Sequence, residues 1–203
     1  PLAHFLCVID PATTEKYSAK NMKLMAGVEP EFHLINSDGS AVSDPKDTQD
    51  KPCYDQSAIM RRLDVIAEIC STMVKLGWGP YQNDHEKAIA EKHGFRATFM
   101  PKPFINLTGN GCHVHLSVWD NARKTNLFED EKGELGVSKL GYHFLGGLMN
   151  HAAAMAAISN PTVNSYKRIN APRTISGATW SPSSITYGGN NRTHMVRIPD
   201  AGR

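Results

Sequence analysis

The sequence has no apolar run that could cross a bilayer. Its longest apolar stretch, the alanine-rich segment Ala152–Ile158, is far shorter than the roughly 20 residues that a membrane-spanning helix needs. Charge of one sign is lacking too, because 22 lysines and arginines stand against 20 aspartates and glutamates, without a basic run. We therefore expect neither a membrane nor a nucleic acid as partner.

Cysteine is scarce, and its spacing shows no pattern. The four cysteines form no CxxC pair. This usage favours reduced thiols and a cytoplasmic location over a disulfide scaffold. With 203 residues and 40% hydrophobic residues, the chain is large enough for one domain with a real core, or for one domain plus a fragment.

The most informative segment present is Gly109–Ser117, which reads GNGCHVHLS. Strict alternation from Gly111 to Trp119 predicts a strand that carries His113 and His115 on one face. The glycines before it let the backbone approach a ligand closely. The pattern predicts a metal or phosphate site, although two structural histidines under a loop would give the same pattern.

Two carboxylates lie on one face of a second predicted strand, Met25–Ile35. Glu29 and Glu31 would stand about 7 Å apart and repel each other unless a cation lies beside them. They are either divalent-metal ligands or part of a solvated strand face. Zinc held by Cys112 and the histidines is disfavoured because Cys112 faces the other way, and carboxylates with one histidine suit Mg²⁺ or Mn²⁺ better.

Donor-rich residues follow in the second half of the chain, in Asn160–Arg168 and at Arg192, Arg197 and Arg203. Arginines converge where a carboxylate or phosphate is held by two hydrogen bonds. Each arginine alone is more simply a surface ion pair. Three such segments together with acidic metal ligands favour a phosphate-handling site.

The remaining patterns mix helices and strands without regular βαβ alternation, which predicts an α+β fold. An amphipathic helix is expected over Asp55–Leu76, capped by Asp55 or Ser57 and ended by Gly77, with Leu63 among its inward apolar positions. A longer helix is expected over Ser138–Ser159, with Leu145, Met155 and Ile158 among its inward residues. The other expected elements are a loop over Asn36–Pro52, an extended segment over Ala97–Leu107 and a strand over His194–Pro199.

One junction does not read as continuous chain. Lys87–Gly94 has the pattern of the last two turns of a helix, with Gly94 as its left-handed stop. The residues before it, Gln82–Glu86, read as the end of a strand, and a two-turn helix without a start is marginal. We therefore expect residues to be missing between Glu86 and Lys87, and the chain to be truncated after Arg203.

Glu29–Phe32, Gly109–Ser117 and Asn160–Arg168, in this order, resemble the catalytic domain of glutamine synthetases. The closest resemblance is to the type III-like branch, which contains the γ-glutamylmethylamide synthetases (glutamate–methylamine ligases). It implies a curved antiparallel sheet with flanking helices over residues 24–203. Residues 1–23 would be the tail of an amino-terminal β-grasp-like domain that is largely missing.

The resemblance also implies roles for individual residues. Glu29 and His113 would bind one Mg²⁺ or Mn²⁺ ion, and Glu31 and Glu86 the other. Gly109 and Arg168 would contact the substrate glutamate. The expected nucleotide and phosphate contacts are His115, Ser117, Arg192, Arg197 and Arg203, and Arg168 and Arg192 would be the catalytic arginines.

The reaction implied is ATP-dependent formation of an amide from L-glutamate and methylamine, through γ-glutamyl phosphate. Ammonia as the amine, or a non-catalytic structural member of the same fold, are the alternatives. Methylamine is favoured because the flap after Arg168, Ile169–Thr174, lacks the family's glutamate. Two further metal-ligand glutamates of the family, one shortly after Glu86 and one past Arg203, have no counterpart. The family also implies a dodecamer of two hexameric rings with shared active sites.

Overall fold

The computed structural model describes residues 11–46, 57, 60–77, 87–169, 171 and 181–200. The chain divides into two compact units, and the boundary between them falls within two strands. The first unit comprises Pro1–Val28, Val114–Pro161 and Trp180–Arg203, and the second comprises Glu29–His113 and Thr162–Thr179. Both units contain helices and strands, in agreement with the predicted α+β class.

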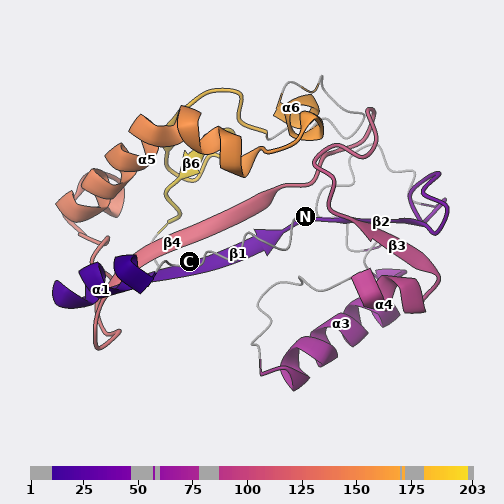
Figure 1. Ribbon diagram of the computed structural model, residues 1–203, viewed down its shortest axis with the longest axis horizontal. Helices are drawn as coiled ribbons and strands as arrows, with labels where there is room; N and C mark the ends of the chain where they lie inside the picture. Colours follow the sequence, from indigo (N-terminus) through magenta and orange to yellow (C-terminus); the bar gives the residue numbers. More distant parts are fainter. Residues whose placement is uncertain are drawn as a thin grey trace. The chain divides into compact units, whose positions relative to one another are not determined.

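The longest strands are β1 (Met22–Pro30) and β4 (Cys112–Asp120), which pair with each other (Figure 1). The strand predicted over Gly111–Trp119 is therefore confirmed within one residue at each end. In its second half Val118 is buried, with 1% exposed, between the half-buried Ser117 and Trp119. In its first half the contrast is lost, because Val114 is 48% exposed.

The prediction of a single strand over Met25–Ile35 is wrong, because strand β1 ends at Pro30. A second strand, β2 (His33–Asn36), pairs antiparallel with β3 (Phe95–Thr98). Proline lacks the N–H that a continuing ladder would need, which is consistent with the break. The extended segment predicted over Ala97–Leu107 is strand only at its start, in β3.

The helix predicted over Asp55–Leu76 is interrupted. Ser57 and Met60 are helical, but α3, the amphipathic helix of the second unit, spans only Leu63–Lys75, so Ser57 does not cap it. Arg61 and Arg62 form a turn before it, and Arg62 makes no side-chain cap bond. Asp55 lies outside the described residues. The predicted end is confirmed, since Gly77 follows the helix with a φ of +78°. The predicted inward position Leu63 is 47% exposed, and Val65 is buried in its place.

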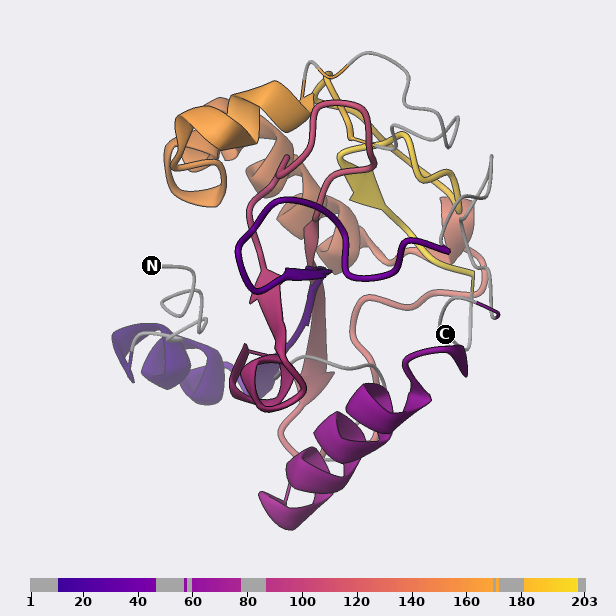
Figure 2. The ribbon, with the colours of Figure 1, turned by 90° about the vertical axis from the view of Figure 1, so that its right-hand side faces the viewer.

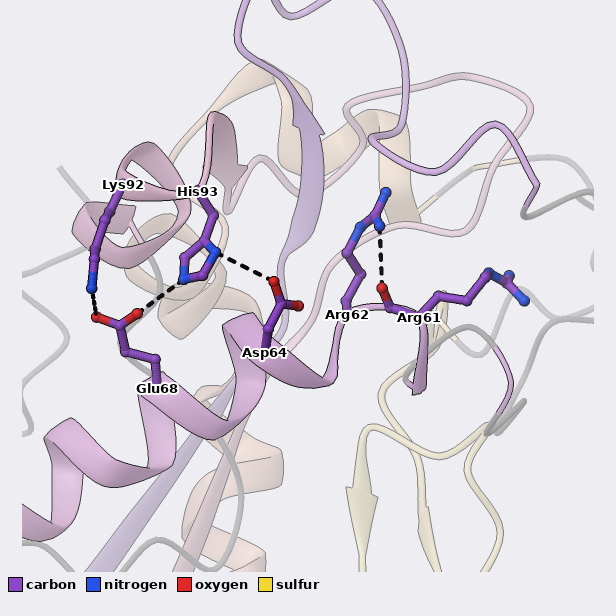
Figure 3. A network of polar contacts seen from close by, with 6 residues as sticks. All are labelled: Arg61, Arg62, Asp64, Glu68, Lys92 and His93. Carbon is purple, nitrogen blue, oxygen red and sulfur yellow. Dashed lines mark hydrogen bonds and ion pairs between the residues drawn. The ribbon is translucent and has the colours of Figure 1, made fainter.

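Helix α4 (Lys87–Lys92) packs against α3 around a small apolar core. Ion pairs join the two helices: Glu68 of α3 lies 2.5 Å from Lys92 Nζ and 2.9 Å from His93 Nε2. Asp64 lies 3.4 Å from the other ring nitrogen of His93 (Figure 3). Gly94 has a φ of +79°, which confirms the predicted left-handed stop. The suspected junction after Glu86 lies outside the described residues on its amino-terminal side.

The longest helix, α5 (Lys139–Ser159), belongs to the first unit and matches its prediction closely (Figures 1 and 2). Ser138 caps it by accepting a hydrogen bond from the N–H of Gly141 at 3.1 Å. The predicted inward face is only partly correct. Leu145 is buried, whereas Met155 and Ile158 are 41% and 67% exposed.

Shorter elements complete the described part. Helix α1 spans Pro11–Ala19 and a 3₁₀ turn, η2, spans Glu134–Gly136. Strand β5 (Tyr187–Gly188) pairs in parallel with β6 (Val196–Arg197), so the strand predicted over His194–Pro199 is shorter than expected. Among the described residues, the helices are all too short or too polar to cross a membrane.

Candidate active site

The site begins where the break after β1 meets the glycine loop before β4, both in the second unit. The backbone N–H of Gly111 donates to Oε2 of Glu31 at 2.6 Å, and the N–H of Glu31 donates to the carbonyl of Gly111 at 2.8 Å. The other oxygen of Glu31, Oε1, lies 3.4 Å from Nε2 of His113. Two residues predicted as metal ligands are thus neighbours.

Glu31 is held in its charged form by these contacts. Burial acts to raise the pKa of its carboxyl group and is the largest single influence. The hydrogen bonds from His113 and from the N–H of Gly111, with the charges of His113 and Arg168, together outweigh burial, and the pKa of Glu31 is lowered. The carboxylate is therefore available as an anion at neutral pH.

Neighbouring groups approach both glycines of the loop where a side chain would lie. A Cβ on Gly109 would lie 2.3 Å from the carbonyl oxygen of Pro101 and 2.9 Å from Cδ of Arg168. A Cβ on Gly111 would lie 3.1 Å from Nη2 of Arg168 and 3.2 Å from both Glu31 Oε2 and His113 Nε2. Because Gly111 has no side chain, an arginine, a carboxylate and an imidazole can come close together around its Cα.

Arg168 reaches this space from α6 (Val163–Ile169), a helix that the sequence reading did not anticipate. Burial, the larger influence, lowers the pKa of its guanidinium, while the charge of Glu31 acts to raise it. The buried ammonium of Lys102 lies close enough to be affected, and its pKa is lowered by burial first and by the charge of Arg168 second. Positive charge is thus concentrated beside the glycine loop.

Asn110, between the two glycines, is a residue that sequence reasoning missed. It is only 6% exposed, and its side chain bonds to His33 and to two backbone carbonyls. The available signal was its place inside a Gly-Asn-Gly turn, where a polar side chain that is buried needs hydrogen-bond partners.

The residues present fit a divalent cation in their chemistry. Carboxylate oxygens and one imidazole are ligands that suit Mg²⁺ and Mn²⁺, and one of each, from Glu31 and His113, approaches Gly111. Glu29 lies half-buried at the end of β1, two residues before Glu31. Within the part of the chain that the structure describes, no three His, Cys, Asp or Glu side chains gather closely enough to hold a metal. Glu86, the fourth predicted ligand, lies outside that part.

The residues predicted to contact the nucleotide belong to the first unit. His115 and Ser117 follow along β4, and Ser117 accepts a hydrogen bond from the indole N–H of Trp119 at 2.9 Å. Ser117 and Trp119 line a hollow of about 360 Å³ together with Met25 and Arg123. Its lining thus combines two largely apolar side chains, Met25 and Trp119, with a hydroxyl and a guanidinium.

The three late arginines are placed as follows. Arg192 lies exposed in the turn before β6, and Arg197 lies half-buried within β6. Arg203 lies outside the described residues. The structure therefore brings together Glu31, His113, Gly109 and Arg168, whereas His115, Ser117, Arg192 and Arg197 are described in the other unit.

A protein-family model described as "Glutamine synthetase, catalytic domain" matches residues 85–203. A protein named glutamine synthetase from Rhizobium meliloti (strain 1021) is 56% identical, over 97% of this chain and 55% of its own length. A protein named glutamate–methylamine ligase from Methyloversatilis universalis is 40% identical, over 91% of this chain and 49% of its own length.

Among solved structures, one named "GmaS/ADP complex-Conformation 1" superimposes with a TM-score of 0.83 at 58% identity. The match covers 94% of this chain and 51% of that chain. The chain thus spans about half the length of the relatives and of the solved structure that it matches.

Proposed function

Because the chain belongs to the glutamine synthetase family, we propose that it carries part of the active site of an ATP-dependent ligase. The substrates proposed are L-glutamate and an amine, with methylamine favoured over ammonia. The observation that supports this most is the cluster around Gly111, where a guanidinium lies beside a carboxylate–imidazole pair. An arginine that can hold a substrate carboxylate next to acidic metal ligands is what amide formation from glutamate requires.

In the proposed reaction, an oxygen of the γ-carboxylate of glutamate attacks the γ-phosphorus of ATP, and ADP leaves. The amine nitrogen then attacks the acyl carbon, inorganic phosphate leaves, and the amine loses a proton. Arg168 and the backbone of Gly109 hold the glutamate, so positioning and electrostatics supply most of the rate enhancement. Two bound Mg²⁺ or Mn²⁺ ions, one held by Glu29 and His113 and the other by Glu31 and Glu86, would neutralise charge on the phosphoryl oxygens.

The preference for methylamine is supported by the sequence after Arg168. Ile169–Thr174 contains no carboxylate that could bind ammonium, which leaves room for a less polar amine. Relatives carry both names, glutamine synthetase at 56% identity and glutamate–methylamine ligase at 40%. The acceptor is therefore the part of the proposal that needs the most direct test.

The first unit supplies the proposed nucleotide contacts. We assign the hydroxyl of Ser117, the ring of His115, and the guanidinium groups of Arg192, Arg197 and Arg203 to contacts with the nucleotide and its phosphates. We further propose a dodecamer of two hexameric rings with shared active sites, in the cytoplasm. Light scattering of the purified gene product measures its assembly.

The decisive experiment compares two amines on the full gene product. Initial rates of phosphate release are measured with ATP, glutamate and Mg²⁺ or Mn²⁺, plus either methylamine or ammonium, and the amide product is identified by mass. Faster turnover with methylamine is expected. Faster turnover with ammonium would overturn the choice of amine alone. No phosphate release with either amine would contradict the ligase assignment and favour a non-catalytic member of the family.

A further inference from the structure

The buried amide of Asn110 has a single orientation that satisfies its neighbours. Its Nδ2 lies 2.9 Å from the carbonyl oxygens of both Thr98 and Met100, and these can only accept. Both N–H groups are therefore used there, and Oδ1 faces Nδ1 of His33 at 2.8 Å. His33 must then carry a proton on Nδ1, so every group of this small network has a partner.

A second asparagine, Asn164, forms hydrogen bonds to the backbone of the same segment at its other end, Lys102. The N–H of Lys102 donates to Oδ1 of Asn164 at 2.6 Å, and Nδ2 of Asn164 donates to the carbonyl of Lys102 at 2.9 Å. Between these two sets of hydrogen bonds, the N–H of Asn110 donates to the carbonyl of Pro101 at 2.9 Å. We call residues 98–102, held in this way, the strap.

The two asparagines stand next to the groups that would bind glutamate. Asn110 lies between Gly109 and Gly111, and Asn164 lies one helical turn before Arg168 on α6. The strap therefore joins the glycine loop to the helix that carries the arginine. Its packing is tight, since the carbonyl of Pro101 occupies the space where a Cβ of Gly109 would lie.

We propose that Asn110 is a positioning residue that sets the spacing between the glycine loop and Arg168, and so the affinity for glutamate. This inference rests on the proposed function. Asn110 itself faces away from the loop into His33 and the strap, so it acts through Gly109, Gly111 and Arg168 without touching substrate. Replacing a residue that orients the ligands of a metal typically costs about 10- to 100-fold in metal affinity or activity. We expect an effect of similar size for a residue that orients the groups that bind glutamate.

The test is Asn110→Ser in the full gene product, with Asn126→Ser as the matched control. Asn126 also donates through Nδ2, to Glu129 at 2.9 Å, and accepts through Oδ1, from the N–H of Phe128 at 3.1 Å, but it lies in the first unit. For Asn110→Ser we expect the KM for glutamate to rise roughly 10- to 100-fold. The KM for ATP of Asn110→Ser should match the wild type. The control, Asn126→Ser, should match the wild type in thermal stability.

A second variant decides the matter if Asn110→Ser does not fold. His33→Phe removes the donor to Oδ1 of Asn110 but keeps an aromatic ring beside Phe104, whose centroid lies 6.4 Å away. We expect the KM for glutamate to rise here as well, by less than in Asn110→Ser, because the two carbonyl contacts of Asn110 remain.

Three outcomes would overturn the inference. These are unchanged constants in both variants, an equal deterioration of kcat and of the KM for ATP and glutamate, or the same KM change in Asn126→Ser. In each of these cases the wild type remains an active ligase and the proposed function stands. A wild type that is inactive with both amines contradicts the proposed function, and the inference falls with it.

Discussion

Replacing Gly109 by alanine tests the close packing of the strap on the glycine loop. The added Cβ would lie 2.3 Å from the carbonyl oxygen of Pro101, and real Cβ contacts stay beyond 3.0 Å, so the oxygen must retreat by at least 0.7 Å. That oxygen belongs to the backbone and accepts a hydrogen bond from Asn110, so it cannot move as a side chain can. Overpacking of this kind typically costs about 1–3 kcal/mol.

The matched control is Gly146→Ala. Gly146 lies in α5, and a Cβ there would meet nothing within 4 Å. Alanine stabilises a helix interior by roughly 0.5–1 kcal/mol relative to glycine. The same chemical change is therefore predicted to lower stability at one position and to raise it at the other.

The assay is the thermal midpoint of the full gene product, measured for both variants at one protein concentration, with the KM for glutamate measured beside it. Gly109→Ala should melt below the wild type and bind glutamate more weakly, since Arg168 is the next contact of the added Cβ, at 2.9 Å. Gly146→Ala should melt at or above the wild type. A Gly109→Ala protein with wild-type melting and a wild-type KM would refute the packing argument.

Two further predictions concern stability. Glu68→Gln should weaken the contact between α3 and α4, because it removes the negative charge that Lys92 and His93 bind. The hydrogen bonds from Lys92 first and His93 second lower the pKa of Glu68 below its ordinary 4.5. A carboxylate with a lowered pKa stabilises the fold above pH 4.5, and this stabilisation is lost as the pH falls through the pKa of Glu68 in the folded state. Melting curves of wild type and variant should thus converge in acid, and a gap independent of pH would count against this ion pair. Ser138→Ala removes the cap of α5 and should cost about 1 kcal/mol by urea titration, whereas Ser138→Asn should keep most of the stability; equal losses would contradict the capping role.

Local signals predicted the elements that depend on local physics. The alternation of β4 and the apolar periodicity of α5 are set by neighbouring residues, and both elements appear within a residue of their expected bounds. The left-handed glycines after α3 and α4 were likewise predictable. The resemblance to glutamine synthetases, which rested on three ordered motifs, is confirmed by the family match and by the superposition with a solved structure.

Features that depend on distant partners were not predictable in the same way. The strand predicted through Pro30 divides in two because β2 finds its partner in β3, about 60 residues later in the sequence, whereas β1 pairs with β4. Exposure on α5 was also misjudged, since periodicity marks an apolar face without stating what covers it. The roles assigned to the metal ligands, the glutamate contacts, the nucleotide contacts and the catalytic arginines all stay predictions.

The Gly-Asn-Gly loop has a consequence for anyone who wishes to transplant the site. Its outer residues have no side chains, so charged neighbours can come close. Its middle residue, Asn110, is hydrogen-bonded to residues that lie outside the sequence motif. The nonapeptide Gly109–Ser117 grafted into another scaffold would keep its sequence but lose the hydrogen bonds that hold Asn110. The smallest transferable unit includes the strap, the Nδ1 donor of His33 and the first turn of α6, which together span well over a hundred positions of sequence.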